Sequence, residues 1–213
     1  MKKIIMLVLF TALAACVFAQ NGVIREITGD VELKHAGAAS FVPAAAGARV
    51  NLNTIISTGF RSTAVVAIGN SVITVRPLTR LSLEEIQRTE NSENINVNLQ
   101  AGRVRVEVNP PAGTRSNFTV QSPSATASVR GTSFDFDTVN ISVDKGTVAF
   151  SGNTGPAAIV NTGNTTFVST EGTAVNPVEV TSAALIPPSP AGIPQNKAAP
   201  SKVSVNLNID LSF

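Results

Sequence analysis

The sequence predicts an all-β protein whose short, paired strands form a twisted, solenoid-like or sandwich-like domain. Three observations favour this fold class. Apolar and polar residues alternate along many short segments, which is the pattern of a strand with one buried face. Glycine-containing turn signals separate these segments at short intervals. Hydrophobic residues make up 43% of the 213-residue chain but aromatic residues only 5%, so small aliphatic side chains must fill a narrow interior.

The predicted strands follow one another along the chain with turns between them. The apolar positions expected to face the core are Val31 and Leu33; Ile95, Val97 and Leu99; Val104, Val106 and Val108; Phe134 and Phe136; and Val139, Ile141 and Val143. Turns are expected at residues 28–30, 58–59, 69–71, 101–102, 130–132 and 145–147. A helical turn is predicted only for residues 81–87, and it is too short to shape the fold.

Residues 1–19 are typical of a bacterial export signal. Two lysines precede an apolar run at residues 4–18, and small residues precede the expected cleavage between Ala19 and Gln20. The alternative is a lipobox-like Leu-Ala-Ala-Cys sequence, which would place a lipid anchor on Cys16. The run is short for a membrane span, so no transmembrane helix is expected after signal removal.

The charge of the chain depends on this leader. Removing Lys2 and Lys3 lowers Lys plus Arg from 16 to 14, which equals the 14 Asp plus Glu. A neutral mature chain gives no reason to expect a nucleic-acid partner. The single cysteine excludes an internal disulfide, and one Cys with one His argues against a zinc cage.

Few side chains in the sequence point to a catalytic or ligand site. Asp135, Asp137 and Asp144 could hold a cation through their oxygen atoms. We favour the interpretation that Asp135 and Asp137 form the solvent face of a strand, and we predict no metal site. Arg130 could bind an anion through its planar guanidinium. No nucleophile is paired with a base, so the sequence predicts no catalytic residue, no cofactor and no enzyme.

An ordered set of short motifs resembles the FecR domain, an envelope domain of bacteria. The set includes ITGDV at residues 27–31, TG at 58–59, RS at 61–62, IGNS at 68–71, Leu99, Gly102, Val104 and Val106, SP at 122–123, VRGT at 129–132, Phe134, and Val143, Gly146 and Val148. The resemblance covers about residues 23–150, and we place the domain at 23–180. The sequence departs from the family at Asn53, where Gly-Asp is common.

The most diagnostic part of this resemblance is the segment from Val129 to Phe134. Within it, Arg130, Gly131, Thr132 and Phe134 are expected to be structural, with Gly131 supplying a backbone angle that side chains disfavour. The resemblance implies a regulator that senses a signal outside the inner membrane and controls a sigma factor inside. Here the leader runs directly into the domain, so we expect the binding role to carry over and the transduction role not to.

The C-terminal residues form two further predicted segments. Residues 187–200 contain five prolines and are typical of a linker. Residues 203–213 form one amphipathic strand with alternating apolar positions, including Val205, Leu207, Ile209, Leu211 and Phe213. The strand could cap an edge of its own domain, add to the sheet edge of a partner, or be recognised by outer-membrane assembly machinery.

The leading functional hypothesis is an exported, non-enzymatic binding or scaffold domain of the bacterial envelope. It would lie in the periplasm or at the outer membrane and engage a protein or another envelope component. The alternative is a periplasmic signal-sensing component that acts in trans in a sigma-factor or iron-uptake relay. A glycan-cleaving enzyme is a third class, which we disfavour because it requires a cluster of carboxylates on one face. The ligand and the oligomeric state are not predicted.

Overall fold

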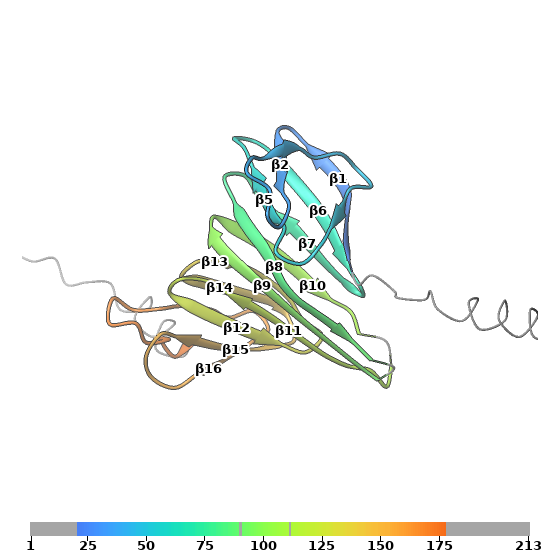
Figure 1. Ribbon diagram of the computed structural model, residues 1–213. Coiled ribbons are helices and arrows are strands. Elements are labelled where there is room, and N and C mark those ends of the chain that lie inside the picture. Colours follow the sequence, from blue (N-terminus) through green and yellow to red (C-terminus); the bar gives the residue numbers. More distant parts are fainter. Residues whose placement is uncertain (1–20, 90, 111, 178–213) are drawn as a thin grey trace, which may run out of the picture.

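The computed structural model describes residues 21–89, 91–110 and 112–177, and it arranges their strands in two sheets (Figure 1). Sheet A comprises β1 (Gly22–Thr28), β4 (Arg49–Val50), β6 (Thr63–Ile68), β7 (Ser71–Val75), β10 (Arg103–Val108), β13 (Ser133–Asp137), β14 (Asn140–Lys145) and β17 (Thr165–Phe167). Sheet B comprises β2 (Val31–Lys34), β3 (Val42–Pro43), β5 (Ile55–Thr58), β8 (Arg80–Arg88), β9 (Ser92–Ala101), β11 (Arg115–Gln121), β12 (Ala125–Val129), β15 (Thr147–Gly152) and β16 (Ala158–Asn161). The predicted all-β class is confirmed.

The chain crosses repeatedly between the sheets and advances along both of them. Hairpins such as β6–β7 and β13–β14 extend sheet A, while β8–β9, β11–β12 and β15–β16 extend sheet B. Neighbouring strands are antiparallel except for β9 and β11, which run parallel. Neither sheet closes on itself, so the domain is a two-sheet sandwich whose hairpins succeed one another as in a solenoid (Figure 1).

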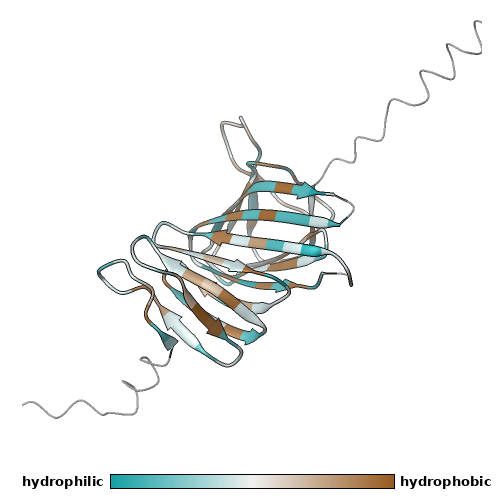
Figure 2. Cartoon of the chain, turned by 90° about the horizontal axis from the view of Figure 1, so that it is seen from below, coloured by the Kyte–Doolittle hydropathy of each residue, from teal (hydrophilic) through white to brown (hydrophobic). Residues whose placement is uncertain are grey.

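One hydrophobic core lies between the two sheets. Hydrophobic and hydrophilic residues alternate along the strands, as the colouring of Figure 2 shows. Phe136 of sheet A and Phe150 of sheet B meet across this core, with their ring centroids 6.1 Å apart in an edge-to-face arrangement. The predicted inward positions on β2, β9, β10 and β13 are all buried. Period-2 alternation therefore identified the buried face of each of these strands.

The prediction of a helical turn at residues 81–87 is wrong, because these residues lie in strand β8. The register of β8 against β9 shifts between Leu83 and Glu85, which marks a β-bulge. The bulge lets Leu81, Leu83 and Ile86 all face the core despite their unequal spacing. The three-residue step from Leu83 to Ile86 also fits the period of a helix, which explains the wrong prediction.

The expected core position at Val139 is also wrong. Val139 is 36% exposed and lies in the turn between β13 and β14, while Ile141 and Val143 are buried as predicted. The Asp137 carboxylate accepts hydrogen bonds from the backbone N–H groups of Val139 and Asn140, at 3.3 and 2.8 Å. This Asx-type turn begins the strand one residue later than the alternation indicated.

Asn53, where the sequence departs from the FecR pattern, has a φ of 59°. Asparagine tolerates this left-handed conformation better than most residues, because its short side-chain amide can form hydrogen bonds with the nearby backbone. The turn is further fixed by a 2.6 Å hydrogen bond from the Asn53 N–H to the Leu83 carbonyl. Asn53 therefore forms a turn in this chain without a glycine at that position.

Several terminal predictions lie outside the described residues. These are the export signal at 1–19 with Ala19 and Gln20, the lipidation candidate Cys16, the linker at 187–200 and the strand at 203–213. The end of the predicted domain, 23–180, also falls beyond residue 177. Across the part of the chain that is described, no helix has the length and hydropathy needed to cross a bilayer.

Candidate functional site

The outer face of sheet A carries a row of oppositely charged side chains on neighbouring strands. Strand β10 points Arg103, Arg105 and Glu107 away from the core, because the valines between them fill the inward positions. Antiparallel pairing places Arg103 opposite Asp137 and Arg105 opposite Asp135 on β13. Opposite charges at facing positions stabilise a sheet, whereas like charges would repel.

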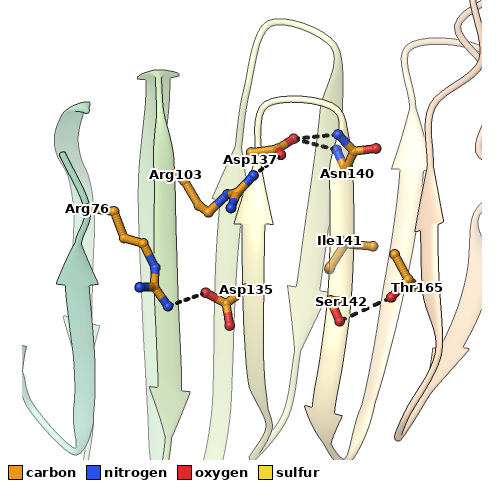
Figure 3. A pocket seen from close by; sticks show the side chains of 8 residues that line it. All are labelled: Arg76, Arg103, Asp135, Asp137, Asn140, Ile141, Ser142 and Thr165. Atoms are coloured by element: carbon orange, nitrogen blue, oxygen red, sulfur yellow. Dashed lines mark hydrogen bonds and ion pairs between the residues drawn. The ribbon is translucent and has the colours of Figure 1, made fainter. Parts of the chain in front are cut away.

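These side chains form an ionic ladder, defined as Arg76, Arg103, Arg105, Glu107, Asp135, Asp137 and Asp144. Arg105 is its centre: its Nη1 lies 2.7 Å from Asp135 Oδ2, and its Nη2 lies 2.6 Å from Asp144 Oδ2. Arg76, which follows β7, reaches the other oxygen of Asp135 at 3.0 Å. Arg103 Nη2 lies 3.1 Å from Asp137 Oδ2 (Figure 3).

A hollow of about 490 Å³ opens beside the ladder, and we call it the sheet A hollow. It is lined by Arg76, Arg103, Asp135, Asp137, Asn140, Ile141, Ser142 and Thr165 (Figure 3). The Thr165 hydroxyl donates to the Ser142 hydroxyl at 3.1 Å, and the Asn140 amide donates to Asp137 at 2.9 Å. The hollow therefore combines fixed charges of both signs with hydroxyl and amide groups.

Two groups of the ladder have shifted pKa values. For Asp137, burial opposes ionisation, but hydrogen bonds from the backbone and side chain of Asn140, from Val139 and from Arg103 outweigh it and lower the pKa. For Arg105, burial alone would lower the pKa, but its hydrogen bond to Asp144 and the charges of Asp135 and Asp144 raise it. Both shifts favour the charged forms of these two side chains.

The lowered pKa of Asp137 predicts a pH-dependent contribution to stability. A folded-state pKa below the unfolded one stabilises the protein above the unfolded pKa, and this contribution is lost as the pH falls through the folded value. We expect Asp137→Asn to lower the free energy of unfolding by about 1 kcal/mol at pH 7. In strong acid, where both states are protonated, the difference should largely vanish. Urea titrations at the two pH values, followed by circular dichroism, measure it.

The ladder leaves some arginine hydrogen-bond donors unused. Each arginine carries five N–H donors in a planar fork, and the ladder occupies only some of them. The Nε of Arg76 is buried and has no hydrogen-bond partner. Among the described residues there is no group of three or more His, Cys, Asp or Glu side chains placed to hold a metal ion.

The structure separates the residues that the sequence singled out. Asp135, Asp137 and Asp144 lie in the ladder, each as the partner of an arginine. Arg130 lies elsewhere, beside a second hollow over strands β12 and β15 of sheet B. The residues Gly131, Thr132 and Phe134 of the FecR-like motif do not line this hollow. Gly131 has a φ of 72°, while Thr132 and Phe134 are buried.

Sequence reasoning missed Arg76, Asn140, Ser142 and Thr165 as part of this site. Arg76 and Asp135 are 59 positions apart, so only the register of β7, β10 and β13 brings them together. Alternation did place Ser142 on the polar face of its strand. No local signal in the sequence indicated which strand would lie beside it.

Comparison with known proteins gives one family and two structures. Residues 54–149 match the family model described as "FecR protein". No curated protein matches the chain. Two crystal structures of a "putative anti-sigma factor" from Parabacteroides distasonis ATCC 8503 are similar, at 18% and 19% identity with TM-scores of 0.46 and 0.47. They cover 61% and 62% of this chain, which spans only 64% and 65% of theirs.

Proposed function

We propose that the protein is a non-enzymatic binding module that presents the outer face of sheet A to a protein partner, and the match of residues 54–149 to the FecR family model supports a binding role. The observation that carries the proposal is the ionic ladder beside the sheet A hollow. Its charges are held in place by one another before any partner arrives. Preorganised charges of both signs favour a partner with complementary charges, and they set specificity and register more than raw affinity.

The exposed ends of the ladder are suited to direct contact. The side chains of Arg76 and Arg103 are 42% and 58% exposed, although each holds an aspartate. A partner carboxylate or backbone carbonyl can reach their unused N–H donors without breaking the existing ion pairs. The hydroxyls of Ser142 and Thr165, which line the same hollow, add donors and acceptors for a peptide group.

We place this binding role in a regulatory context, since the FecR family is one of regulators. The protein would act outside the cytoplasm, in the periplasm or at the outer membrane, after removal of residues 1–19 or after lipidation of Cys16. Residues 203–213 would supply a second attachment, by pairing as a strand with the edge of a partner sheet. The second candidate function, a sensor acting in trans on a sigma-factor relay, is favoured by the family match alone.

The experiment compares partner capture by two arginine variants. We expect the double variant Arg76→Gln/Arg103→Gln to retain its fold, because exposed ion pairs contribute only about 0–1 kcal/mol each. Chemical cross-linking and pull-down from cell envelopes first identify the dominant partner protein. The affinity of the double variant for this protein should fall at least about ten-fold, because interfacial charge pairs contribute more than surface ones. Affinity is measured by titrating the purified partner on immobilised bait protein.

The matched control is Arg115→Gln, which removes an exposed arginine at the start of β11 in sheet B. This variant should bind the partner as the native protein does. Equal affinity for native protein and the double variant would refute the proposal that sheet A carries recognition. Equal losses in the double variant and in the control would show that net charge matters and the ladder does not.

A further inference from the structure

Two neighbouring turns expose the large apolar side chains Phe60 and Leu78. Phe60 follows β5 and is 71% exposed, and Leu78 follows β7 and is 63% exposed. The Leu78 N–H donates a 3.2 Å hydrogen bond to the Gly59 carbonyl, so the two turns are joined. We call Phe60 and Leu78 together the apolar tip. Large apolar side chains gathered at one exposed point mark a contact site more often than scattered ones do.

The backbone holds these side chains outward in an unusual conformation. Leu78 has a φ of 56° and Arg61, next to Phe60, has a φ of 54°. Bulky residues seldom adopt this left-handed region. Neighbouring hydrogen bonds fix both turns: the Thr79 N–H donates to the Thr58 hydroxyl at 3.0 Å, and the Ser62 N–H donates to the Gly59 carbonyl at 3.3 Å. The tip is therefore a rigid feature of the fold.

Each side chain of the apolar tip is followed closely in the sequence by an arginine. The Arg61 guanidinium lies over the Phe60 ring, with its Cζ 5.2 Å from the ring centroid. Arg80 comes two residues after Leu78, and its Cζ lies 5.7 Å from the centroid of Phe41. Within residues 21–89, 91–110 and 112–177, neither arginine forms an ion pair. Their positive charges remain available for anions outside the protein.

We propose that the apolar tip docks on an anionic lipid surface, with Phe60 and Leu78 in the interface and Arg61 and Arg80 on lipid phosphates. Charge complementarity favours this occupant, because anionic headgroups attract cations that flank buried apolar groups. Two side chains are enough for shallow insertion, which requires no complementary surface. The proposal is independent of the role of the sheet A hollow.

The absence of tryptophan and tyrosine from the sequence makes a direct test possible. In Phe60→Trp, the single tryptophan reports on the environment of the tip. The protein is purified from its host in its processed form and mixed with vesicles of phosphatidylcholine and phosphatidylglycerol, or of phosphatidylcholine alone. We expect a blue shift of tryptophan emission with the anionic vesicles only, and its reversal by added salt.

Further substitutions distinguish the contribution of the tip to vesicle binding from that of the rest of the chain. Arg61→Gln and Arg80→Gln in this background should each weaken binding about five-fold, and Leu78→Ser should weaken it further. The matched controls are Ile159→Ser, at an exposed apolar position on β16, and Arg115→Gln, and both should bind as the parent does. The proposal is overturned if the blue shift is absent. It is also overturned if Arg61→Gln, Arg80→Gln and Leu78→Ser all leave the blue shift unchanged. A native dimer that dissociates on Phe60→Ser, as measured by sedimentation, also overturns it and assigns the tip to a second copy.

Discussion

Phe136→Ala is expected to lower the free energy of unfolding by about 3–5 kcal/mol, which approaches the lower end of the stability of natural domains. Phe136 is fully buried in β13 and meets the ring of Phe150 from the opposite sheet. Removing the ring leaves a cavity at the point where the two sheets contact each other, and rigid strands on both sides cannot collapse into it. Urea unfolding followed by circular dichroism measures the change.

The matched control is Phe60→Ala, which removes the same side chain from an exposed turn. Its effect on the free energy of unfolding should remain within about 0.5 kcal/mol. If both substitutions changed stability equally, Phe136 would not lie in the core between the sheets. The two-sheet arrangement would then need revision.

Gly102→Ala should have the second largest effect, a loss of roughly 3 kcal/mol. Gly102 has a φ of 91° in the turn between β9 and β10, a conformation that a side chain strains. An added Cβ would also lie 2.5 Å from the Cα of Thr79 and 2.7 Å from the carbonyl oxygen of Leu78. Both are backbone atoms, so neither can move aside cheaply. The midpoint of thermal or urea unfolding reports the loss.

Gly37→Ala separates the steric effect from the conformational one. Gly37 has a similar positive φ of 75°, but an added Cβ there meets nothing within 4 Å. Only the conformational penalty should remain, at about 1 kcal/mol. Equal losses at Gly37 and Gly102 would contradict the close approach of the Thr79 turn to Gly102.

Local patterns in the sequence were sufficient to predict which side chains are buried in most strands. Phe134 and Phe136 face the core and Asp135 and Asp137 face solvent because successive side chains in a strand point to opposite sides. The same rule placed Arg103 and Arg105 on one exposed face with Glu107. These predictions need only the period of a strand, which neighbouring residues determine.

The partners of these side chains could not be predicted from local patterns. Arg105 and Asp135 meet because β10 pairs with β13, although a different sheet's hairpin, β11–β12, lies between them in sequence. The parallel pairing of β9 with β11 is likewise a property of the whole fold. The bulge between Leu83 and Glu85 shifts the register of β8 against β9, and the Asp137 turn takes Val139 out of the strand. Alternation alone reveals neither.

The two outer faces of the sandwich differ in chemistry. Sheet A carries the ionic ladder, whereas the outward positions of β9 in sheet B are Asn94, Asn96 and Asn98. Their register partners on β11 are Asn117, Thr119 and Gln121, which are also uncharged. These facing positions of β9 and β11 are therefore uncharged, unlike the facing positions of β10 and β13 in sheet A.

Site-specific photocrosslinking from the two faces tests most directly whether sheet A carries recognition. A photoreactive residue replaces Ser142 in the sheet A hollow or, in a second variant, Thr126 on the outward side of β12 in sheet B. In intact cells, we predict that position 142 cross-links to one dominant protein and position 126 does not. Cross-linking to the same protein from position 126, with none from position 142, would contradict the assignment of sheet A as the binding face.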